Sequence, residues 1–410
     1  MANKNLTNAK IAKKDEFYTR WEEKEKEVNA YLEYNKNVFR DKTILLPADD
    51  PFESNFFKFF AVHFNDFGLK RLIATSYDSS PVVNTQLSLF DDENQVTNTS
   101  SKAYKIDLTH VEDFDHDGRF NIEDVEKMLN EEKYKLNHGN KSTVLSYLKG
   151  DEEPDGINRF VPGDFRSKEV TKLRNEADII VTNPPFSLFR DFIKWVEPKQ
   201  RGILVIGNIN AVTYKEIFPL IKQNILWLGA TNFNTGIYFY VPRDFKYKKS
   251  YKFLKEIDGK KVNRVPGTCW FTNLDHGRRH QPLSLMSMAD NIKFSKHKEI
   301  RGKSYYHYIN YDAIEVPFTD SIPDDYDGVM GVPITFLDKY NPTQFKIMGM
   351  CENKDLYHLK TRVFSTEECH QAYEDKFHKK GTYDLNASGV IEKDGRFEKV
   401  YQRILIKKVL

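Results

Sequence analysis

The sequence has few cysteines, no long apolar run and almost no net charge. Its three cysteines, Cys269, Cys351 and Cys369, are spaced neither as a disulfide framework nor as a zinc motif, which excludes a small cross-linked scaffold. No apolar run approaches the roughly 18 residues of a membrane span. The 62 Lys and Arg against 60 Asp and Glu give a net charge of +2, so any surface for nucleic acid must be a local patch.

The amino-terminal segment 1–14 is polar and rich in lysine, with no apolar core behind it. We therefore expect neither a secretory leader nor a membrane anchor, and a reducing cytoplasm is the simplest location. The histidines, cysteines and serines form no recognisable nucleophile or zinc arrangement, and we expect no bound metal. A chain of 410 residues is long enough for a catalytic domain of about 250 residues and a smaller module.

Apolar runs and helical patterns alternate along the first two thirds of the chain. Segment 15–34 predicts an amphipathic helix, and segment 55–64 predicts a second helix that is rich in aromatic residues. Segment 167–176 and the stretch behind Ser187, a plausible N-cap, predict two more helices. The predicted strands are 43–47, 71–75, 178–182, 202–207, 224–228, 235–241 and 268–272, and an insertion follows the run 104–108. This order predicts an open α/β sheet.

The alternation stops near residue 277, where basic, aromatic and proline residues become frequent. We place a domain boundary there, with a catalytic domain over 1–276 and a second, α+β region over 277–410. Segment 79–102 is rich in Ser, Asn, Asp and Thr without periodicity, which predicts a mobile loop.

Asn183-Pro-Pro-Phe186 follows the predicted strand 178–182, and ligands bind outside such strand ends in open α/β sheets. The side-chain oxygen of Asn183 and the main-chain oxygen of Pro184 can accept the two hydrogens of one amino group, and Pro184 and Pro185 fix the backbone. Drawing those hydrogens out of the ring plane frees the nitrogen lone pair without a strong base, while Phe186 stacks on the ring. The alternative is a Pro-Pro turn after a strand, with Phe186 filling the core.

Several segments give the chain a resemblance to the adenine-N6 DNA methyltransferases, and among them to the EcoRI-type modification methylases. These segments run in family order over nearly the whole chain, and the stretch from Gly163 to Arg190 is the most specific of them. They are 15–19, 49–56, 163–167, 177–190, 268–274 and 331–342.

The resemblance implies a Rossmann-like sheet, S-adenosylmethionine as methyl donor and an adenine flipped out of double-stranded DNA. It implies a catalytic role for Asn183, Pro184, Pro185 and Phe186. By the same resemblance, Asp164 and Phe165 read the adenine of the cofactor. The 19 residues between Asp164 and Asn183 leave room for one helix and one strand, which predicts that the two lie at adjacent strand ends.

Three further positions match the family motif near the methionine end of the cofactor, where a hydroxyl could hold its carboxylate. They are Phe17, Tyr18 and Thr19.

The loop after the first strand departs from the Gly-x-Gly turn of most methyltransferases. It begins at Pro47, and the EcoRI-like branch has Asp-Asp-Pro here, so Asp49 and Asp50 are candidates for the cofactor's amino group or ribose, or form a solvated turn. Asp78, after the second strand, is a weaker candidate for the ribose. Asn208 and Asn210 could line the target pocket or form a plain turn.

Segment 113–124 resembles a calcium-binding loop at its first, third, fifth and sixth positions, occupied by Asp113, Asp115, Asp117 and Gly118. It ends in Asp124 where a bidentate glutamate is expected. An acidic loop leading into a helix is the favoured interpretation.

Basic residues interleaved with aromatics follow residue 277 and suit contacts with phosphates and bases, although a solvated basic face has the same composition. The candidates for DNA binding are Arg278, Arg279, Lys293, Lys296, Lys298 and Arg301.

The sequence thus predicts a site-specific adenine-N6 methyltransferase of duplex DNA, serving a restriction–modification system or acting alone. We expect a monomer that has a cognate endonuclease only as an indirect companion. RNA-adenine or protein-glutamine methylation is the alternative reaction, and an inactive nucleic-acid-binding relative is the alternative class.

Overall fold

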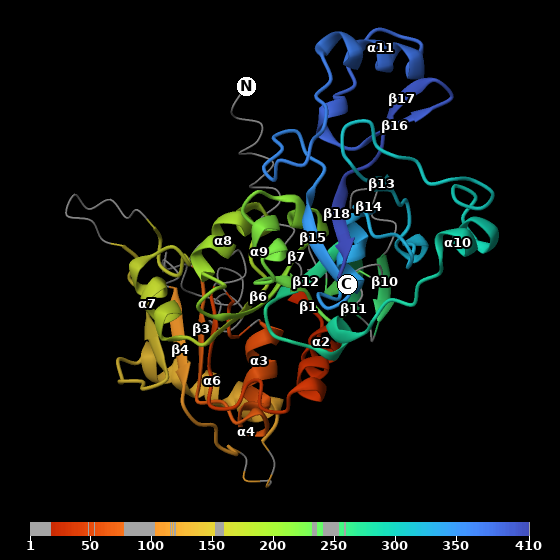
Figure 1. Cartoon of the computed structure of the whole chain (residues 1–410). Helices are drawn as coiled ribbons and strands as arrows, with labels where there is room; N and C mark the ends of the chain where they lie inside the picture. The colour runs from red at the N-terminus through yellow and green to blue at the C-terminus, as the bar shows by residue number, and fades with distance from the viewer. Residues whose placement is uncertain are drawn as a thin grey trace. The chain divides into compact units, whose positions relative to one another are not determined.

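The computed structural model in Figure 1 describes residues 18–47, 49–52, 54–77, 103–114, 116, 118, 120–151, 160–231, 236–240, 254–257 and 260–409. The chain divides into two compact units, Met1–Leu220 with Ile225–His276, and Ile221–Asn224 with Gly277–Leu410. Among the described residues, no helix is long and apolar enough to cross a membrane. The predicted loop 79–102 lies outside these ranges.

The first unit is built on a sheet of eight strands in the order β5-β4-β3-β2-β6-β7-β12-β8. Strands β3, β2, β6 and β7 are parallel, and the strands toward both edges are antiparallel. Their bounds are β2 Thr43–Leu46, β3 Arg71–Thr75, β4 Tyr104–Leu108, β5 Leu145–Tyr147, β6 Ile179–Thr182, β7 Gly202–Asn208, β8 Trp227–Leu228 and β12 Thr268–Thr272. The predicted α/β sheet is confirmed, and it is a mixed sheet of the Rossmann-like kind.

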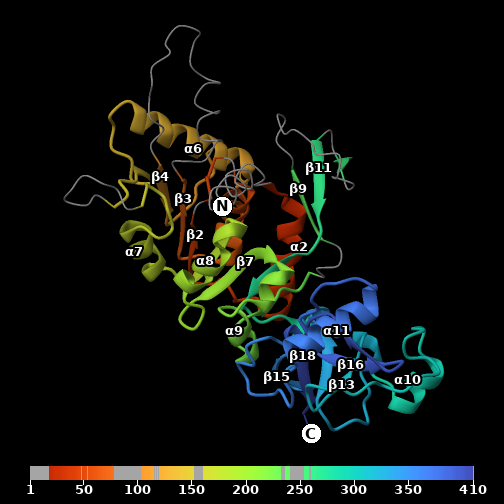
Figure 2. The ribbon, with the colours of Figure 1, turned by 90° about the horizontal axis from the view of Figure 1, so that it is seen from above.

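The central strands β2 and β6 are buried along their whole length, which shows that both faces of this sheet are covered. Helices α2, α3 and α6 share one apolar core with alternate strand residues such as Ile44 and Val181. On the other face Phe189 of α8 lies 5.1 Å, ring centre to ring centre, from Phe271 of β12. Strands β4, β3 and β2 can be followed side by side in Figure 2.

Among its described residues, this unit contains the four predicted helices and three further α-helices for which no range was predicted from the sequence. They are α2 Trp21–Tyr34, α3 Asn55–Val62, α4 Phe64–Phe67, α6 Ile122–Asn137, α7 Lys168–Glu176, α8 Phe189–Val196 and, at the unit boundary, α9 Phe218–Lys222. Ser54 and Ser167 cap α3 and α7 through their hydroxyls.

Ser187 as a helix cap is a wrong prediction. Residues Phe186–Leu188 form a short 3₁₀ turn, and the cap position of α8 is Leu188. The turn arises because Pro185 has an extended ψ of 121°, after which the Leu188 amide donates to the Pro185 carbonyl at 2.9 Å.

A second, smaller sheet in this unit has the order β1-β9-β11-β10. Its strands are β1 Tyr18–Thr19, β9 Ile237–Tyr240, β10 Leu254–Ile257 and β11 Lys260–Val265. The predicted helix 15–34 therefore starts later than expected, since Tyr18 and Thr19 pair with Tyr240 and Phe239 instead.

The buried carboxylate of Glu27 ties α2 to the chain that follows β8. It accepts hydrogen bonds from the amides of Ala230 at 2.8 Å and Thr231 at 2.7 Å, and from the Tyr31 hydroxyl at 2.5 Å. Three donors satisfy a carboxylate that burial would otherwise penalise.

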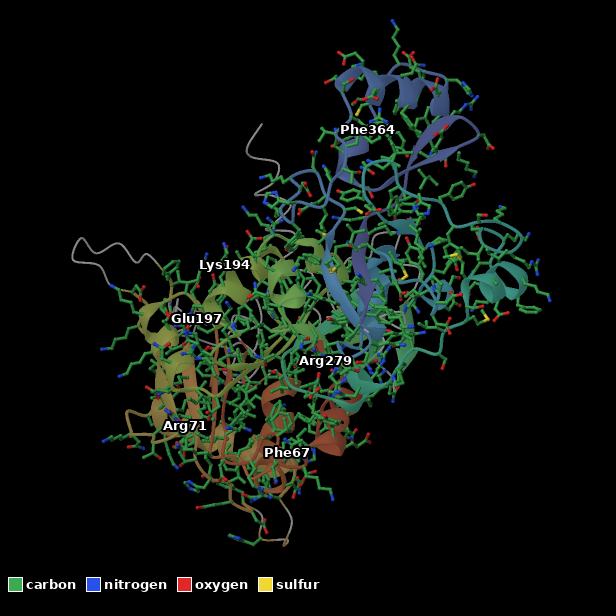
Figure 3. All side chains as sticks on the ribbon, viewed as in Figure 1. Phe67, Arg71, Lys194, Glu197, Arg279 and Phe364 are labelled. Atoms are coloured by element: carbon green, nitrogen blue, oxygen red, sulfur yellow. The ribbon has the colours of Figure 1, made fainter. Side chains whose placement is uncertain are left out.

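The second unit has an antiparallel core with one parallel pair. Its four-stranded sheet has the order β13-β14-β18-β15, and a separate hairpin joins β16 and β17. The strands are β13 Ile314–Glu315, β14 Met330–Pro333, β15 Phe345–Met350, β16 Val390–Lys393, β17 Arg396–Lys399 and β18 Arg403–Lys408. Its helices are α10 Met288–Phe294 and α11 Thr366–Phe377. Near α11 and the hairpin, Phe364 (labelled in Figure 3) is buried with Cys369 and Val390.

A buried ion pair joins two strands of the four-stranded sheet of the second unit, β13 and β18. Arg403 of β18 donates from Nη2 to Oε1 of Glu315 at 2.5 Å and from Nε to both carboxylate oxygens at 3.1 Å. The Tyr308 hydroxyl donates to the same carboxylate, and burial raises the pKa of that tyrosine. Both ions are buried, so removing one leaves the other uncompensated.

We expect Glu315→Ala to destabilise the second unit by about 3–5 kcal/mol, because Arg403 would remain buried without its partner. Hydrogen exchange of the β18 amides would measure the loss locally. The exposed Glu299→Ala is the matched control and should leave β18 protected. Equal protection in both variants would contradict the structural role of this pair.

Candidate active site

The carboxyl ends of β2, β3 and β6 are joined by hydrogen bonds just beyond the strands. The amide of Asp49 donates to the Thr75 carbonyl at 2.8 Å, and the Thr182 hydroxyl donates to the Pro47 carbonyl at 3.1 Å. These bonds bring the loop that starts at Pro47 to the edge from which Asn183 emerges. This is the edge at which open α/β sheets bind ligands.

The Asn183-Pro-Pro-Phe186 segment has the features expected of an amino-group site. The side-chain oxygen of Asn183 is buried and has no hydrogen-bond partner in the described part of the chain. Phe186 is 43% exposed, so the alternative in which this ring fills the core is wrong. An acceptor without a donor and an uncovered aromatic ring lie three residues apart, with the buried Pro184 between them.

Asp49 and Asp50 occupy different environments although they are neighbours. Oδ1 of Asp50 accepts from the Phe52 amide at 3.0 Å and from the Tyr104 hydroxyl, as in the turn alternative. Oδ2 of Asp49 is buried without a partner among the described residues. Burial raises the pKa of Asp49 to about 7, opposed by the Ser54 hydroxyl and the Lys24 ammonium. Asp49 is therefore the member of the pair with a carboxylate oxygen, Oδ2, that lacks a partner among the described residues.

Thr19 lies close to this loop. Its carbonyl accepts from the Asn55 side chain at 3.1 Å, at the start of the helix that follows the loop. The Thr19 hydroxyl is buried without a partner within the described ranges. Of the other two residues of this motif, Phe17 lies outside the described residues, and Tyr18 is placed only as a strand residue paired with Tyr240.

Lys24 belongs to this group and was not among the sequence-predicted site residues. It is fully buried, and its Nζ donates to the Thr19 carbonyl at 3.2 Å and lies 5.0 Å from the centre of the Phe56 ring. Burial lowers the pKa of Lys24 to about 7, against the attraction of Asp49 and Glu22. The signal was present in the spacing, because Lys24, Val28 and Tyr31 follow the i, i+4, i+7 pattern of the buried face of α2.

The turn that carries Asp164 is held against the end of β3. Gly163 has a φ of 81°, and a Cβ there would lie 1.9 Å from the Ser76 carbonyl oxygen, so only glycine fits. The expectation that Asp164 and Asn183 lie at adjacent strand ends is wrong, because β2 separates β3 from β6 in the sheet. The antiparallel β4 and the long insertion behind it place the Asp164 turn beyond β3.

The side chains of Asp164 and Phe165 are engaged within the protein. Asp164 is buried and accepts from Nε and Nη2 of Arg166 at 2.9 and 2.7 Å. Phe165 is buried with edge contacts to Phe192 and Trp195. Their role toward the adenine of the cofactor stays a prediction, and Asp78 lies outside the described residues.

Two other candidate positions take part in local turns. Asn208 accepts from the Asn210 amide at 2.9 Å and caps a 3₁₀ turn, as in the plain-turn alternative. Both oxygens of Asp124 accept backbone amides, from Phe114 at 3.0 Å and Asn121 at 2.8 Å, so Asp124 completes the capping box in which Asn121 is the N-cap of α6. Asp115 and Asp117 of the same segment lie outside the described residues.

The six predicted DNA-binding residues differ in accessibility. Arg278 forms an ion pair with Asp338, and Arg279 is buried and donates to Asn224. The other four are exposed on α10 and the segment after it: Lys293, Lys296, Lys298 and Arg301. Lys296 contacts Asp320 at 2.7 Å. Contact with DNA stays a prediction for all six.

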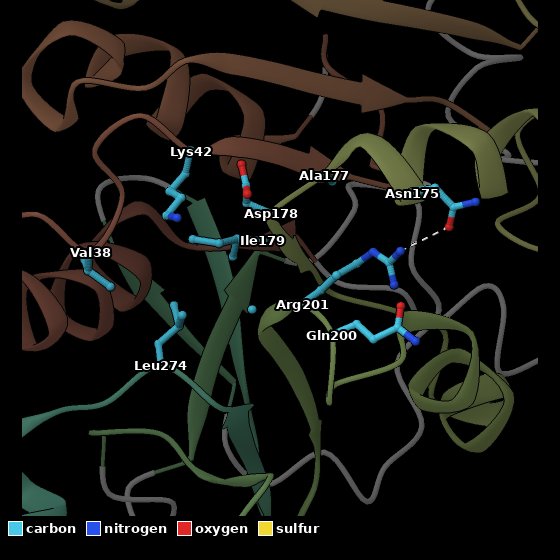
Figure 4. A pocket seen from close by; sticks show the side chains of 10 residues that line it. Val38, Lys42, Asn175, Ala177, Asp178, Ile179, Gln200, Arg201 and Leu274 are labelled. Carbon is cyan, nitrogen blue, oxygen red and sulfur yellow. Dashed lines mark hydrogen bonds between the residues drawn. The ribbon is translucent and has the colours of Figure 1, made fainter.

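A cavity of about 400 Å³ opens at the opposite edge of the main sheet (Figure 4). It is lined by Lys42 and Asp178, which precede β2 and β6, and by Arg201, which precedes β7. Arg201 is already bonded to Asn175 at 3.1 Å and Glu197 at 2.9 Å. Because this cavity lies at the amino ends of the strands, we do not assign it to the reaction.

The raised pKa of Asp49 predicts a pH-dependent stability. Its ordinary value is 3.8, so between about pH 4 and pH 7 the unfolded chain loses the proton that the folded chain keeps, and the free energy of unfolding falls. Asp49→Asn removes this loss. The variant should gain stability over the parent as pH rises to 7, with no further gain above it.

Urea unfolding of the ligand-free protein at pH 5, 6, 7 and 8 would measure this gain. The exposed Asp191→Asn on α8 is the control and should give no pH-dependent difference. A constant difference between Asp49→Asn and the parent at all four pH values would show that the carboxylate is not buried.

The chain is similar to known proteins over most of its length. Residues 5–409 match the family model described as adenine-specific methyltransferase EcoRI. The chain is 38% identical to the Type II methyltransferase M.EcoRI of Escherichia coli over 86% of this chain and 91% of that protein. It is 32% identical to M.MpnI of Mycoplasma pneumoniae over 88% of this chain and 90% of that protein.

A third relative, the Type II methyltransferase M.MgeORF184P of Mycoplasma genitalium, is 34% identical over 88% of this chain and 90% of that protein. No solved structure matches the chain with significance. The family model and all three relatives cover both units, so the likeness extends beyond the methyltransferase motif. The chain therefore belongs to the EcoRI-type family of adenine-specific methyltransferases.

Proposed function

We propose that this methyltransferase transfers the methyl group of S-adenosylmethionine to N6 of an adenine turned out of duplex DNA. The observation that carries the proposal is the buried Asn183 oxygen without a partner, three residues before the exposed ring of Phe186. A buried acceptor without a donor is costly for a protein to keep unless a ligand supplies the donor. The exocyclic amine of adenine is such a donor.

The residues at the same edge fit the amino-acid end of the cofactor. Two more polar atoms there, Oγ1 of Thr19 and Oδ2 of Asp49, are buried without partners in the described ranges. A hydroxyl and a carboxylate suit the carboxylate and the ammonium group of a methionine moiety. When bound, S-adenosylmethionine supplies an electrophilic methyl group.

The chain's own contribution to the reaction is to position and polarise the target amine. Asn183 accepts one amine hydrogen, and the Pro184 carbonyl accepts the other, which directs the nitrogen lone pair out of the ring plane. Phe186 stacks on the flipped base and replaces the neighbours that the base loses on leaving the duplex. An amide is no base, so the proton leaves the product to solvent after transfer.

The two parts of the chain then have separate tasks. We assign cofactor binding and catalysis to residues 1–276 and target recognition to residues 277–410. The exposed Lys293, Lys298 and Arg301, with the 62% exposed ring of Phe294 beside Lys293, support contacts with phosphates and bases.

The relatives' names are those of Type II methyltransferases, which supports a place in restriction–modification, with action as a lone modification enzyme as the variant of this proposal. We further propose a cytoplasmic monomer whose cognate endonuclease shares the DNA sequence without touching this chain.

Methylation of RNA adenine or protein glutamine would need the same grip on an amino group. Incubation with labelled methyl donor and, separately, plasmid DNA, structured RNA and protein extract distinguishes the three substrates. Label in DNA alone supports the proposal, and label only in RNA or protein overturns it.

We expect Asn183→Ala to lower the methylation rate of DNA about 10²- to 10³-fold, because it removes one of two preorganised acceptors on the target amine. Single-turnover methylation of an oligonucleotide duplex would measure this. Binding of S-adenosylhomocysteine should be unchanged.

Asn175→Ala, an exposed asparagine at the opposite edge of the sheet, is the matched control and should methylate at the parent rate. A parent-like rate for Asn183→Ala would remove Asn183 from the catalytic site.

We expect replacement of Lys293, Lys296, Lys298 and Arg301 by Gln to flatten the salt dependence of DNA binding. Each phosphate contact releases condensed counterions and contributes about 0.9 to the slope of log affinity against log salt. Since Lys296 is already paired with Asp320, its share should be the smallest. Fluorescence anisotropy at four or five salt concentrations would measure the slope.

A fourfold Gln variant at the exposed Lys376, Lys379, Lys380 and Lys393 has the same change in charge and is the control. If the slope changes only in this control, the phosphate contacts lie around α11 and the hairpin rather than around α10.

A further inference from the structure

The group formed by Thr19, Lys24 and Asp49 contains hydrogen-bond donors and acceptors that have no partner among the described residues. Lys24 carries three N–H donors, and one of them is used, toward the Thr19 carbonyl at 3.2 Å, within the described part of the chain. The Thr19 hydroxyl and Oδ2 of Asp49 are buried and without partners in the same ranges. Donors and acceptors thus coexist here without pairing.

Lys24 and Asp49 attract each other but do not form a direct ion pair. Each is among the charges that act on the other, yet no contact within 4 Å joins them among the described residues. A buried ammonium and a buried carboxylate normally make contact, because separate burial of the two charges is expensive. Because the two residues are not in contact, a ligand that carries a negative group beside Lys24 and a positive group beside Asp49 can satisfy both charges.

The other charges near this pair do not replace such a group. Glu22 acts on Lys24 only at a distance and is itself paired with Arg20 at 3.1 Å. Asp50 has the same sign as Asp49 and is engaged by the Phe52 amide. The apolar neighbours are aromatic, with Nζ of Lys24 at 5.0 Å from the Phe56 ring and 6.0 Å from the Trp21 ring.

We propose that Lys24 binds the carboxylate of the amino-acid end of the cofactor, with the Thr19 hydroxyl beside it, and that Asp49 binds its ammonium group. The inference rests on the proposed function, since it takes S-adenosylmethionine as the ligand. A zwitterionic α-amino acid satisfies both charges and the orphaned hydroxyl together. Lys24 is then a specificity-determining residue, which distinguishes the intact cofactor from adenosine derivatives that lack the carboxylate.

Three ligands that share the adenosine part separate this role from a structural one. S-adenosylhomocysteine carries both charges, its decarboxylated analogue carries only the amine, and methylthioadenosine carries neither. Calorimetry with the full-length protein should show Lys24→Met weakening the first about 10- to 100-fold, the range for a lost charge-assisted hydrogen bond. The same variant should bind the other two ligands like the parent.

Two further variants complete the comparison. Asp49→Asn should weaken both ligands that carry the amine and leave methylthioadenosine unaffected. Lys26→Met, an exposed lysine two residues along α2, should change none of the three affinities.

The outcomes separate the inference from the proposed function. A parent protein that binds none of the three ligands contradicts the cofactor itself. Parent binding of S-adenosylhomocysteine together with an equal loss of all three ligands in Lys24→Met would show that Lys24 only holds Thr19 and α2 in place. If Lys24→Met does not fold, the affinities of the parent protein test the inference. Equal affinity for S-adenosylhomocysteine and its decarboxylated analogue would show that the protein does not bind the carboxylate, which overturns the inference.

Discussion

The alignment of four parallel strands is the constraint on which the site depends. Strands β3, β2, β6 and β7 all end at one edge, and backbone and hydroxyl hydrogen bonds at Thr75 and Pro47 fix how the loops leave that edge. Those loops are short after β2 and β6, so their first polar residues, Asp49 and Asn183, have little freedom to move away. The chemistry comes from a few side chains, but their convergence is a property of the sheet.

Burial is the main cause of the shifted pKa values of Lys24 and Asp49. Lys24 and Asp49 both have pKa values near 7 because low-polarity surroundings disfavour their charged forms. A ligand with complementary charges would stabilise the charged forms of both residues, so its binding would be coupled to their protonation. The buried Glu315 and Arg403 of the second unit show the opposite arrangement, in which the two ions contact each other directly and Tyr308 also donates to the carboxylate.

The sequence was informative where a signal is local. Buried apolar runs located the central strands of the main sheet but not the edge strand β5, and Asn183-Pro-Pro-Phe186 was found from its place after one of them. What it missed depends on contacts far apart in the chain. Strand β1 exists only because Tyr18 and Thr19 pair with β9. The spacing places Lys24 on the buried face of α2, but it does not show that this lysine lies close to Asp49. In the second unit the strands are short and irregularly spaced, so periodicity could not order them.

The three hydrogen bonds accepted by Glu27 have a consequence for how the protein is made. Its two amide donors follow it by 203 and 204 residues, and the pairing of β1 with β9 spans a similar stretch of chain. The helix that carries Lys24 is synthesised about 200 residues before these donors, so these bonds can form only after residue 231 has left the ribosome. On a growing chain, the group formed by Thr19, Lys24 and Asp49 is therefore among the last features of the first unit to be completed, and a ligand that needs this group cannot assist the folding steps that precede it.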